Sequence, residues 1–182
     1  MTSETKKSPV SYRFQVNRLP KNGAEVTIEA NEEQRAELAR EHDLESVERF
    51  VADLTIRAWK GDGVLVNGRV QASITQLCVV TLEPIRSEID EEISSIFVPE
   101  TSKLARHRER EIVLDPDADD LPESFSGDSI DIGEMAEEFF ALGIEPYPRK
   151  EGASLEDASH GENGPEGRGL LYEELKKLRG NV

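Results

Sequence analysis

The sequence predicts an α+β fold built mainly on an antiparallel β-sheet, arranged as a meander or a small barrel. Apolar and polar residues alternate over several stretches, most clearly over residues 64–74 and 85–97, which is the period-two pattern of strands that bury one face. The connections between these stretches are short, and short connections favour antiparallel neighbours. Two other segments, which begin at Asn31 and Asp131, carry helix-start signals instead.

The strands are expected in chain order. Residues 10–16 and 26–30 alternate and flank a turn that contains Pro and an Asn-Gly pair. Residues 47–59 are the third expected strand, and the two long strands follow after a Gly-Asp-Gly turn. Between the long strands the segment from Cys78 to Pro84 is predicted to be a compact turn, because proline has no backbone N–H to donate to a neighbouring strand.

The two predicted helices differ in their apolar content. The helix from Asn31 to about Arg40 has few apolar residues and is predicted to lie on the surface. The helix after Asp131 has a broad apolar face that includes Phe139 and Phe140. Only 5% of the chain is aromatic, so both phenylalanines are expected to be buried against the sheet, and this helix is expected to close the core.

Composition divides the rest of the chain. Residues 1–9 are predicted to be disordered, and residues 10–150 are predicted to form a single α+β domain with an acidic loop at 115–129. Residues 151–169 hold five glycines and predict a flexible linker. Residues 170–179 place leucines on one helix face and predict a short amphipathic helix that docks on the domain or on a partner.

The charge of the chain is strongly negative and unevenly distributed. The formal net charge is −16, and between Glu83 and Glu138 there are eighteen acidic residues against five basic ones. Such a protein does not coat DNA by bulk electrostatics, because phosphates are repelled. The chain has no apolar run long enough to span a bilayer and no signal-peptide pattern at its N-terminus. It is therefore predicted to be cytoplasmic and to have no membrane partner.

The candidate chemical groups favour a protein without catalytic, metal or cofactor chemistry. Cys78 is the only cysteine and has no basic neighbour in sequence, so it is predicted to be a small buried residue. Asp115–Asp120 resembles a calcium loop, but Asp120 and Ser126 stand where that loop requires Gly and Glu. The histidines lack zinc spacing, and no motif for nucleophilic or phosphate chemistry occurs. We therefore predict no enzyme activity.

Two basic segments are candidates for contact with RNA. Arg106, Arg108 and Arg110 follow one another at alternate positions and can contact phosphates, or they can balance the adjacent acidic residues. Tyr147, with Arg149 and Lys150 beside it, can stack on a base or pack on its own domain.

Several separated motifs resemble the YceD family, also called the large ribosomal RNA subunit accumulation protein, and they are most similar to its alphaproteobacterial branch. The resemblance covers roughly residues 10–152. Many members carry a second cysteine where this chain has Thr81, so a metal or redox role of such a pair does not transfer to this chain. The segments that resemble the family are Leu44–Leu54, Val70–Ile74, Cys78–Pro84 (which includes Thr81, Leu82 and Glu83), Ile130–Glu134 and Pro146–Lys150 (which includes Tyr147, Pro148 and Arg149).

The resemblance implies a non-enzymatic cytoplasmic factor that 23S rRNA needs in order to accumulate, and it brings no catalytic residues. The implied partner is 23S rRNA or a large-subunit precursor particle, and the acidic surface suits a basic ribosomal protein as well. Two alternatives remain open. One is an acidic protein-binding module or chaperone for a basic partner unrelated to ribosomes; the other is a metal-dependent hydrolase that uses Asp115–Asp120.

Overall fold

The computed structural model describes residues 7–102 and 122–153. The chain divides into two compact units. We call them the sheet unit, Met1–Gln76 with Arg86–Glu145, and the Cys78 unit, Leu77–Ile85 with Pro146–Val182. The domain predicted over residues 10–150 contains residues of both units. The predicted linker beyond residue 153, the predicted helix at 170–179 and most of the predicted N-terminal disorder lie outside the described residues.

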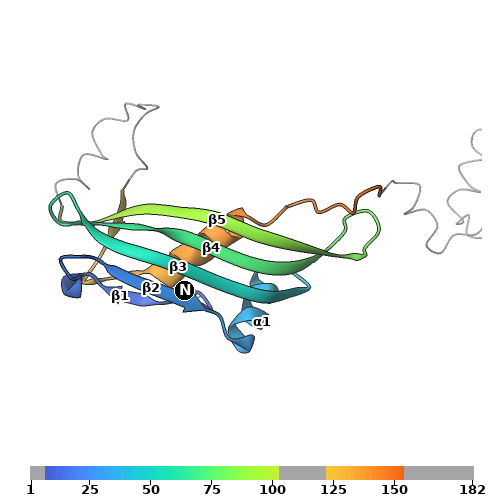
Figure 1. Ribbon diagram of the computed structural model, residues 1–182, viewed down its shortest axis with the longest axis horizontal. Coiled ribbons are helices and arrows are strands. Elements are labelled where there is room, and N and C mark those ends of the chain that lie inside the picture. Colours follow the sequence, from blue (N-terminus) through green and yellow to red (C-terminus); the bar gives the residue numbers. More distant parts are fainter. Residues whose placement is uncertain (1–6, 103–121, 154–182) are drawn as a thin grey trace, which may run out of the picture. The chain divides into compact units, whose positions relative to one another are not determined.

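The fold is α+β, as predicted, with a meandering sheet and a second, two-stranded sheet (Figure 1). The larger sheet has the strand order β2-β3-β4-β5-β6, so among the described residues it has two ends and is not a closed barrel. β2 and β3 pair antiparallel, as do β3 and β4. The strands of this sheet are β2 (Ala24–Glu29), β3 (Ser46–Trp59), β4 (Gly63–Leu77), β5 (Pro84–Pro99) and β6 (Glu123–Phe125).

The two long strands that the alternation predicted are β4 and β5, and they are neighbours in the sheet. Within the sheet unit, Ser73 Oγ donates to Glu88 over 2.6 Å, and Arg69 Nη2 lies 2.8 Å from Glu92. The partner on β5 therefore moves toward the C-terminus as the residue on β4 moves toward the N-terminus, as in an antiparallel pair. All five alternating residues of β4 are buried, and they are Val64, Val66, Val70, Ala72 and Ile74.

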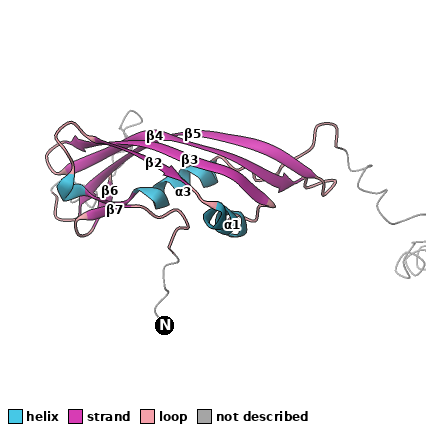
Figure 2. Ribbon diagram, turned by 60° about the horizontal axis from the view of Figure 1, so that its bottom comes forward, coloured by secondary structure: helices cyan, strands magenta, loops and turns pink. Residues whose placement is uncertain are grey.

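The core lies between one face of the larger sheet and two helices that Figure 2 shows on the same side of that sheet. Helix α1 (Glu32–Glu41) begins at Asn31, whose side chain accepts a hydrogen bond from the backbone of Gln34 while the Gln34 side chain accepts one from Asn31. This reciprocal cap satisfies two N–H groups at the helix start. Leu38 and Ala39 are the buried residues of α1, so the predicted surface helix is confirmed.

Helix α3 (Ile132–Leu142) closes the core, as predicted. The Asp131 side chain accepts hydrogen bonds from the backbone N–H groups of Gly133 and Glu134 and so begins the helix. Phe140 is fully buried, and its ring meets that of Phe50 edge to face with 5.4 Å between centroids. The expectation for Phe139 was only partly right, since it packs against the core but is half-buried.

The predicted first strand, residues 10–16, is wrong in length. Strand β1 covers only Arg13–Gln15, and the chain then enters a 3₁₀ turn, η1 (Val16–Arg18). The partner sets this length, because β1 pairs antiparallel with β7 (Ser129–Asp131) through three residue pairs. Val10 is buried for a different reason: it lies beside helix α3, and its carbonyl approaches Gly133.

The acidic loop predicted at 115–129 needs a second correction. Residues 115–121 lie outside the described residues, but the remainder contains β6 and the first residue of β7. β6 pairs in parallel with the end of β5, from Phe97 opposite Glu123 to Pro99 opposite Phe125. Three residues of pairing with a distant strand leave no periodic signal in a polar segment, so the sequence did not reveal it.

Among the described residues, no helix is long and apolar enough to cross a membrane.

Candidate functional site

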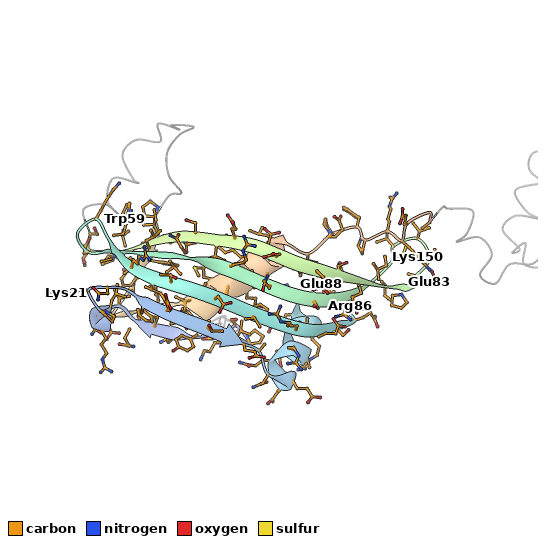
Figure 3. All side chains as sticks on the ribbon, viewed as in Figure 1. Lys21, Trp59, Glu83, Arg86, Glu88 and Lys150 are labelled. Carbon is orange, nitrogen blue, oxygen red and sulfur yellow. The ribbon has the colours of Figure 1, made fainter. Side chains whose placement is uncertain are left out.

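The structure brings two of the sequence-predicted motif segments together in the Cys78 unit. One is the connection from β4 to β5, and the other is the segment from Pro146 to Lys150 that follows helix α3 along the chain. The backbone N–H of Val79 donates to the carbonyl of Pro148 over 2.9 Å. Figure 3 shows Glu83 and Lys150 lying next to each other, one from each segment. Residues about seventy positions apart therefore form one small structure.

The connection from Cys78 to Pro84 is a compact turn, as predicted. The N–H of Cys78 donates to the carbonyl of Glu83 over 2.8 Å, and the N–H of Leu82 donates to the carbonyl of Cys78 over 2.9 Å. Leu82 has a φ of 58°, which is the left-handed region that glycine and asparagine adopt more readily than leucine. Holding a leucine there costs on the order of 1 kcal/mol.

Cys78 lies at the centre of this unit and has no exposed surface. Its Sγ accepts hydrogen bonds from the backbone N–H of Lys150 at 3.4 Å and from that of Thr81 at 3.5 Å. Hydrogen bonds from the Thr81 side chain and from the N–H groups of Lys150 and Thr81 lower the pKa of the Cys78 thiol to about 6. The predicted burial is confirmed, but the sulfur is also a polar acceptor.

No basic residue lies near Cys78 along the sequence, but the fold brings Lys150 to it. Lys150 is 72 positions away, and its backbone reaches the sulfur. The hydrogen bond that the Lys150 ammonium donates to Glu83 raises the pKa of Lys150, and the negative charge of the Cys78 thiolate adds a smaller contribution. Of the donors that lower the pKa of the thiol, Thr81 and Val80 belong to the same turn, and only Lys150 is brought to the sulfur by the fold.

Glu83 and Lys150 form an ion pair across the two segments, with 2.8 Å between Oε2 and Nζ. The hydrogen bond from Lys150, followed by its charge, lowers the pKa of Glu83. Both side chains are more than half exposed, so solvent screens the attraction and the pair adds little to stability. The pair joins one side chain of each segment.

The outer surface of the Cys78 unit is apolar to an unusual degree. Six large hydrophobic residues are exposed in the part of the chain that the structure describes, and four of them belong to this unit. We call these four the apolar surface: Leu77, Val79, Leu82 and Tyr147, which are 39%, 48%, 71% and 72% exposed. Exposed large apolar side chains that belong to one small unit make that unit a candidate site of interaction.

Of the sequence-predicted site residues, the structure brings together Cys78, Thr81, Leu82, Glu83, Pro84, Tyr147, Pro148, Arg149 and Lys150, all within the Cys78 unit. Pro148 is buried, and Arg149 is exposed. Arg106, Arg108 and Arg110 lie outside the described residues, as does Asp115–Asp120.

Leu77 and Val79 were not among the predicted site residues, although Val79 lies within the family motif Cys78–Pro84. For Leu77 the only signal was a strand pattern that ends in apolar residues, and exposure cannot be read from such a pattern alone. Within residues 7–102 and 122–153, no group of three or more His, Cys, Asp and Glu side chains could hold a metal ion.

Fold and site together define an α+β protein whose meandering sheet carries, between its two longest strands, a turn with exposed apolar side chains. Residues 66–177 match the family model described as "Large ribosomal RNA subunit accumulation protein YceD". The chain belongs to the YceD family. This match begins later than the resemblance seen in the motifs and extends beyond it, and it includes every described residue of the Cys78 unit. Comparison with curated proteins found no match, and comparison with solved structures found none either.

Proposed function

We propose that this protein is a non-enzymatic factor for the accumulation of 23S rRNA, and hence for biogenesis of the large ribosomal subunit, and that it acts by binding rRNA, a ribosomal protein or both. The family description ties its members to accumulation of the large ribosomal RNA. We further propose that the protein acts by binding and that it does so in the cytoplasm. The implied partner in the cell is a precursor of the large subunit.

One observation carries the proposal: the Cys78 unit joins two distant family motifs and presents apolar side chains to solvent. The groups at its centre hold the two segments together. The sulfur of Cys78 holds two backbone N–H groups, and Lys150 pairs with Glu83. The groups at its surface, Leu82 and Tyr147 above all, have most of their area available to a partner. This division between internal support and an exposed face suits a binding element.

The sheet unit supports binding of a basic partner. The outward residues of β5 include Glu88, Asp90 and Glu92, all exposed. Arg69 lies 3.1 Å from Asp90 and 2.8 Å from Glu92, so one guanidinium serves two carboxylates. The remaining negative charge attracts proteins of opposite sign, with a range set by the ionic strength.

A second candidate function is an acidic protein-binding module for a basic partner unrelated to ribosomes. The same net charge of −16 and the same apolar surface suit it. The partner separates the two candidates. Co-sedimentation with large-subunit precursors at modest salt supports the ribosomal role, whereas confinement to ribosome-free fractions supports the other.

The decisive experiment is depletion of the protein in cells, followed by quantification of 23S and 16S rRNA. We expect the ratio of 23S to 16S to fall and to recover when the wild-type chain is supplied. An unchanged ratio, or an equal loss of both rRNAs, would contradict the proposed role in the large subunit.

A further inference from the structure

The Cys78 unit differs in charge from the chain that carries it. Its described residues contain two acidic side chains, Glu83 and Glu151, and two basic ones, Arg149 and Lys150. Lys150 is paired with Glu83. The whole chain has a net charge of −16. The described residues of the unit therefore add no net positive charge to overcome the repulsion between this protein and phosphate groups.

One leucine of the apolar surface is unfavourable in two respects, because its apolar side chain is exposed to water and its backbone is in the left-handed region. Leu82 is 71% exposed and has a φ of 58°. Asparagine or glycine adopts this conformation at lower cost and exposes no apolar area. An exposed leucine at this position can stabilise a complex, because its side chain loses contact with water when a partner covers it, and burial of apolar area is favourable.

We infer that the apolar surface binds a protein of net positive charge, of the kind that makes up the large ribosomal subunit, and that it does not bind RNA. The inference rests on the proposed function for the source of the partner. Two observations indicate the chemistry of the partner. The exposed apolar side chains require an apolar counterpart, and the net charge of −16 attracts a basic molecule. Long-range attraction raises the rate of encounter, and apolar anchors hold the complex.

A single substitution tests the anchor. Leu82→Asn suits the left-handed backbone and removes the apolar side chain, so the fold is retained while the surface changes. The matched control is Leu142→Asn, which alters a leucine that is 77% exposed at the end of α3 in the sheet unit. The probes are the proteins extracted with salt from purified large ribosomal subunits, each identified by mass spectrometry, and, separately, protein-free 23S rRNA.

We expect the full-length protein to retain one or a few basic large-subunit proteins. Their dissociation constants should increase roughly tenfold or more in Leu82→Asn, which means weaker binding, and should remain unchanged in Leu142→Asn. Added salt should weaken binding by the wild-type chain and by the control alike. Equal binding by Leu82→Asn and wild type would overturn the inference, as would binding of protein-free 23S rRNA that is lost in Leu82→Asn.

Two other occupants of the surface are distinguishable in the same samples. Leu175 is one of the leucines on the apolar face of the helix predicted at residues 170–179. If Leu175→Asp, in the full chain without a partner, shifts the methyl signals of Leu82, the C-terminal segment covers the surface and the inference fails. It also fails if the protein forms a dimer that Leu82→Asn abolishes. These outcomes are independent of the cellular test, since a normal 23S to 16S ratio after depletion contradicts the ribosomal role and leaves the binding measurement intact.

Discussion

The backbone N–H of Lys150 donates a hydrogen bond to Sγ of Cys78 over 3.4 Å and joins two segments that are 72 positions apart. A second N–H, from Thr81, reaches the same sulfur. A side chain of only two heavy atoms beyond the backbone could not organise two segments by bulk alone. It does so as a buried acceptor for donors that would otherwise lack one.

Cys78→Ala should therefore loosen the Cys78 unit. The substitution removes the acceptor of two part-buried N–H groups, at a cost of at most about 1–3 kcal/mol for each. Hydrogen exchange is the appropriate measurement, and the amides of Lys150 and Thr81 should exchange faster while those in α3 remain protected. Cys78→Ser is the control, because its hydroxyl can still accept. If the Lys150 amide exchanges at the wild-type rate in Cys78→Ala, the sulfur is not its acceptor.

The thiol of Cys78 should titrate far below an ordinary cysteine. Its hydrogen bonds lower the pKa to about 6, whereas the unfolded thiol has a pKa of roughly 8.5. Because the folded pKa is lower, this group stabilises the folded state fully above the unfolded pKa, and that contribution is lost as the pH falls through about 6. The ultraviolet absorbance of the thiolate should rise with a midpoint near that pH, and Cys78→Ser should show no such step. A midpoint near that of the free thiol would contradict the lowered pKa.

Gly133 should not tolerate a side chain. A Cβ at this position would lie 2.0 Å from the carbonyl oxygen of Val10 and 2.6 Å from the backbone nitrogen of Tyr12. Gly133→Ala should therefore push the N-terminal segment away from α3 and lower the free energy of unfolding by roughly 1–3 kcal/mol. Chemical denaturation measures the change. The neighbouring Glu134→Ala, on the exposed side of the helix, should have a much smaller effect, and equal stability of Gly133→Ala and wild type would show that the segment can move at no cost.

Asp131 should make the stability of the sheet unit sensitive to acid. Burial tends to raise the pKa of this carboxyl, but hydrogen bonds from the Ser11 hydroxyl and from the N–H groups of Glu134, Tyr12 and Gly133 outweigh it and lower the pKa. A lowered folded pKa means that the stabilisation is present above the unfolded pKa and is lost as the pH falls through the folded value.

The test is the difference in unfolding free energy between wild type and Asp131→Asn as a function of pH. Asparagine retains one acceptor oxygen at the helix start and has no charge to titrate, so the difference should shrink in acid. Asp131→Ala should lose the cap as well, about 0.5–2 kcal/mol even where the charge no longer matters. A difference that stays constant with pH would rule out a titrating Asp131.

Local sequence determined the parts of this protein that depend on neighbours in the chain. The alternation over β3, β4 and β5 predicted the strands because side chains on a strand point to opposite faces in turn. The caps at Asn31 and Asp131 were predictable for the same reason, since a cap joins residues two or three positions apart. The family motifs were legible as well, because each is a short continuous segment.

Tertiary structure alone decided the rest. The length of β1, the pairing of β6 with β5 and the surroundings of Cys78 each depend on a partner far away in the chain. The residues around Cys78 in the sequence predicted a buried thiol with no basic neighbour along the chain. The fold places the backbone N–H of Lys150 against its sulfur. Hydrogen bonds and pKa shifts fall off over a few ångströms in space and not over positions in sequence. For that reason the turn could be predicted from the sequence. Only the folded chain showed which of its residues hold the turn together and which face outward.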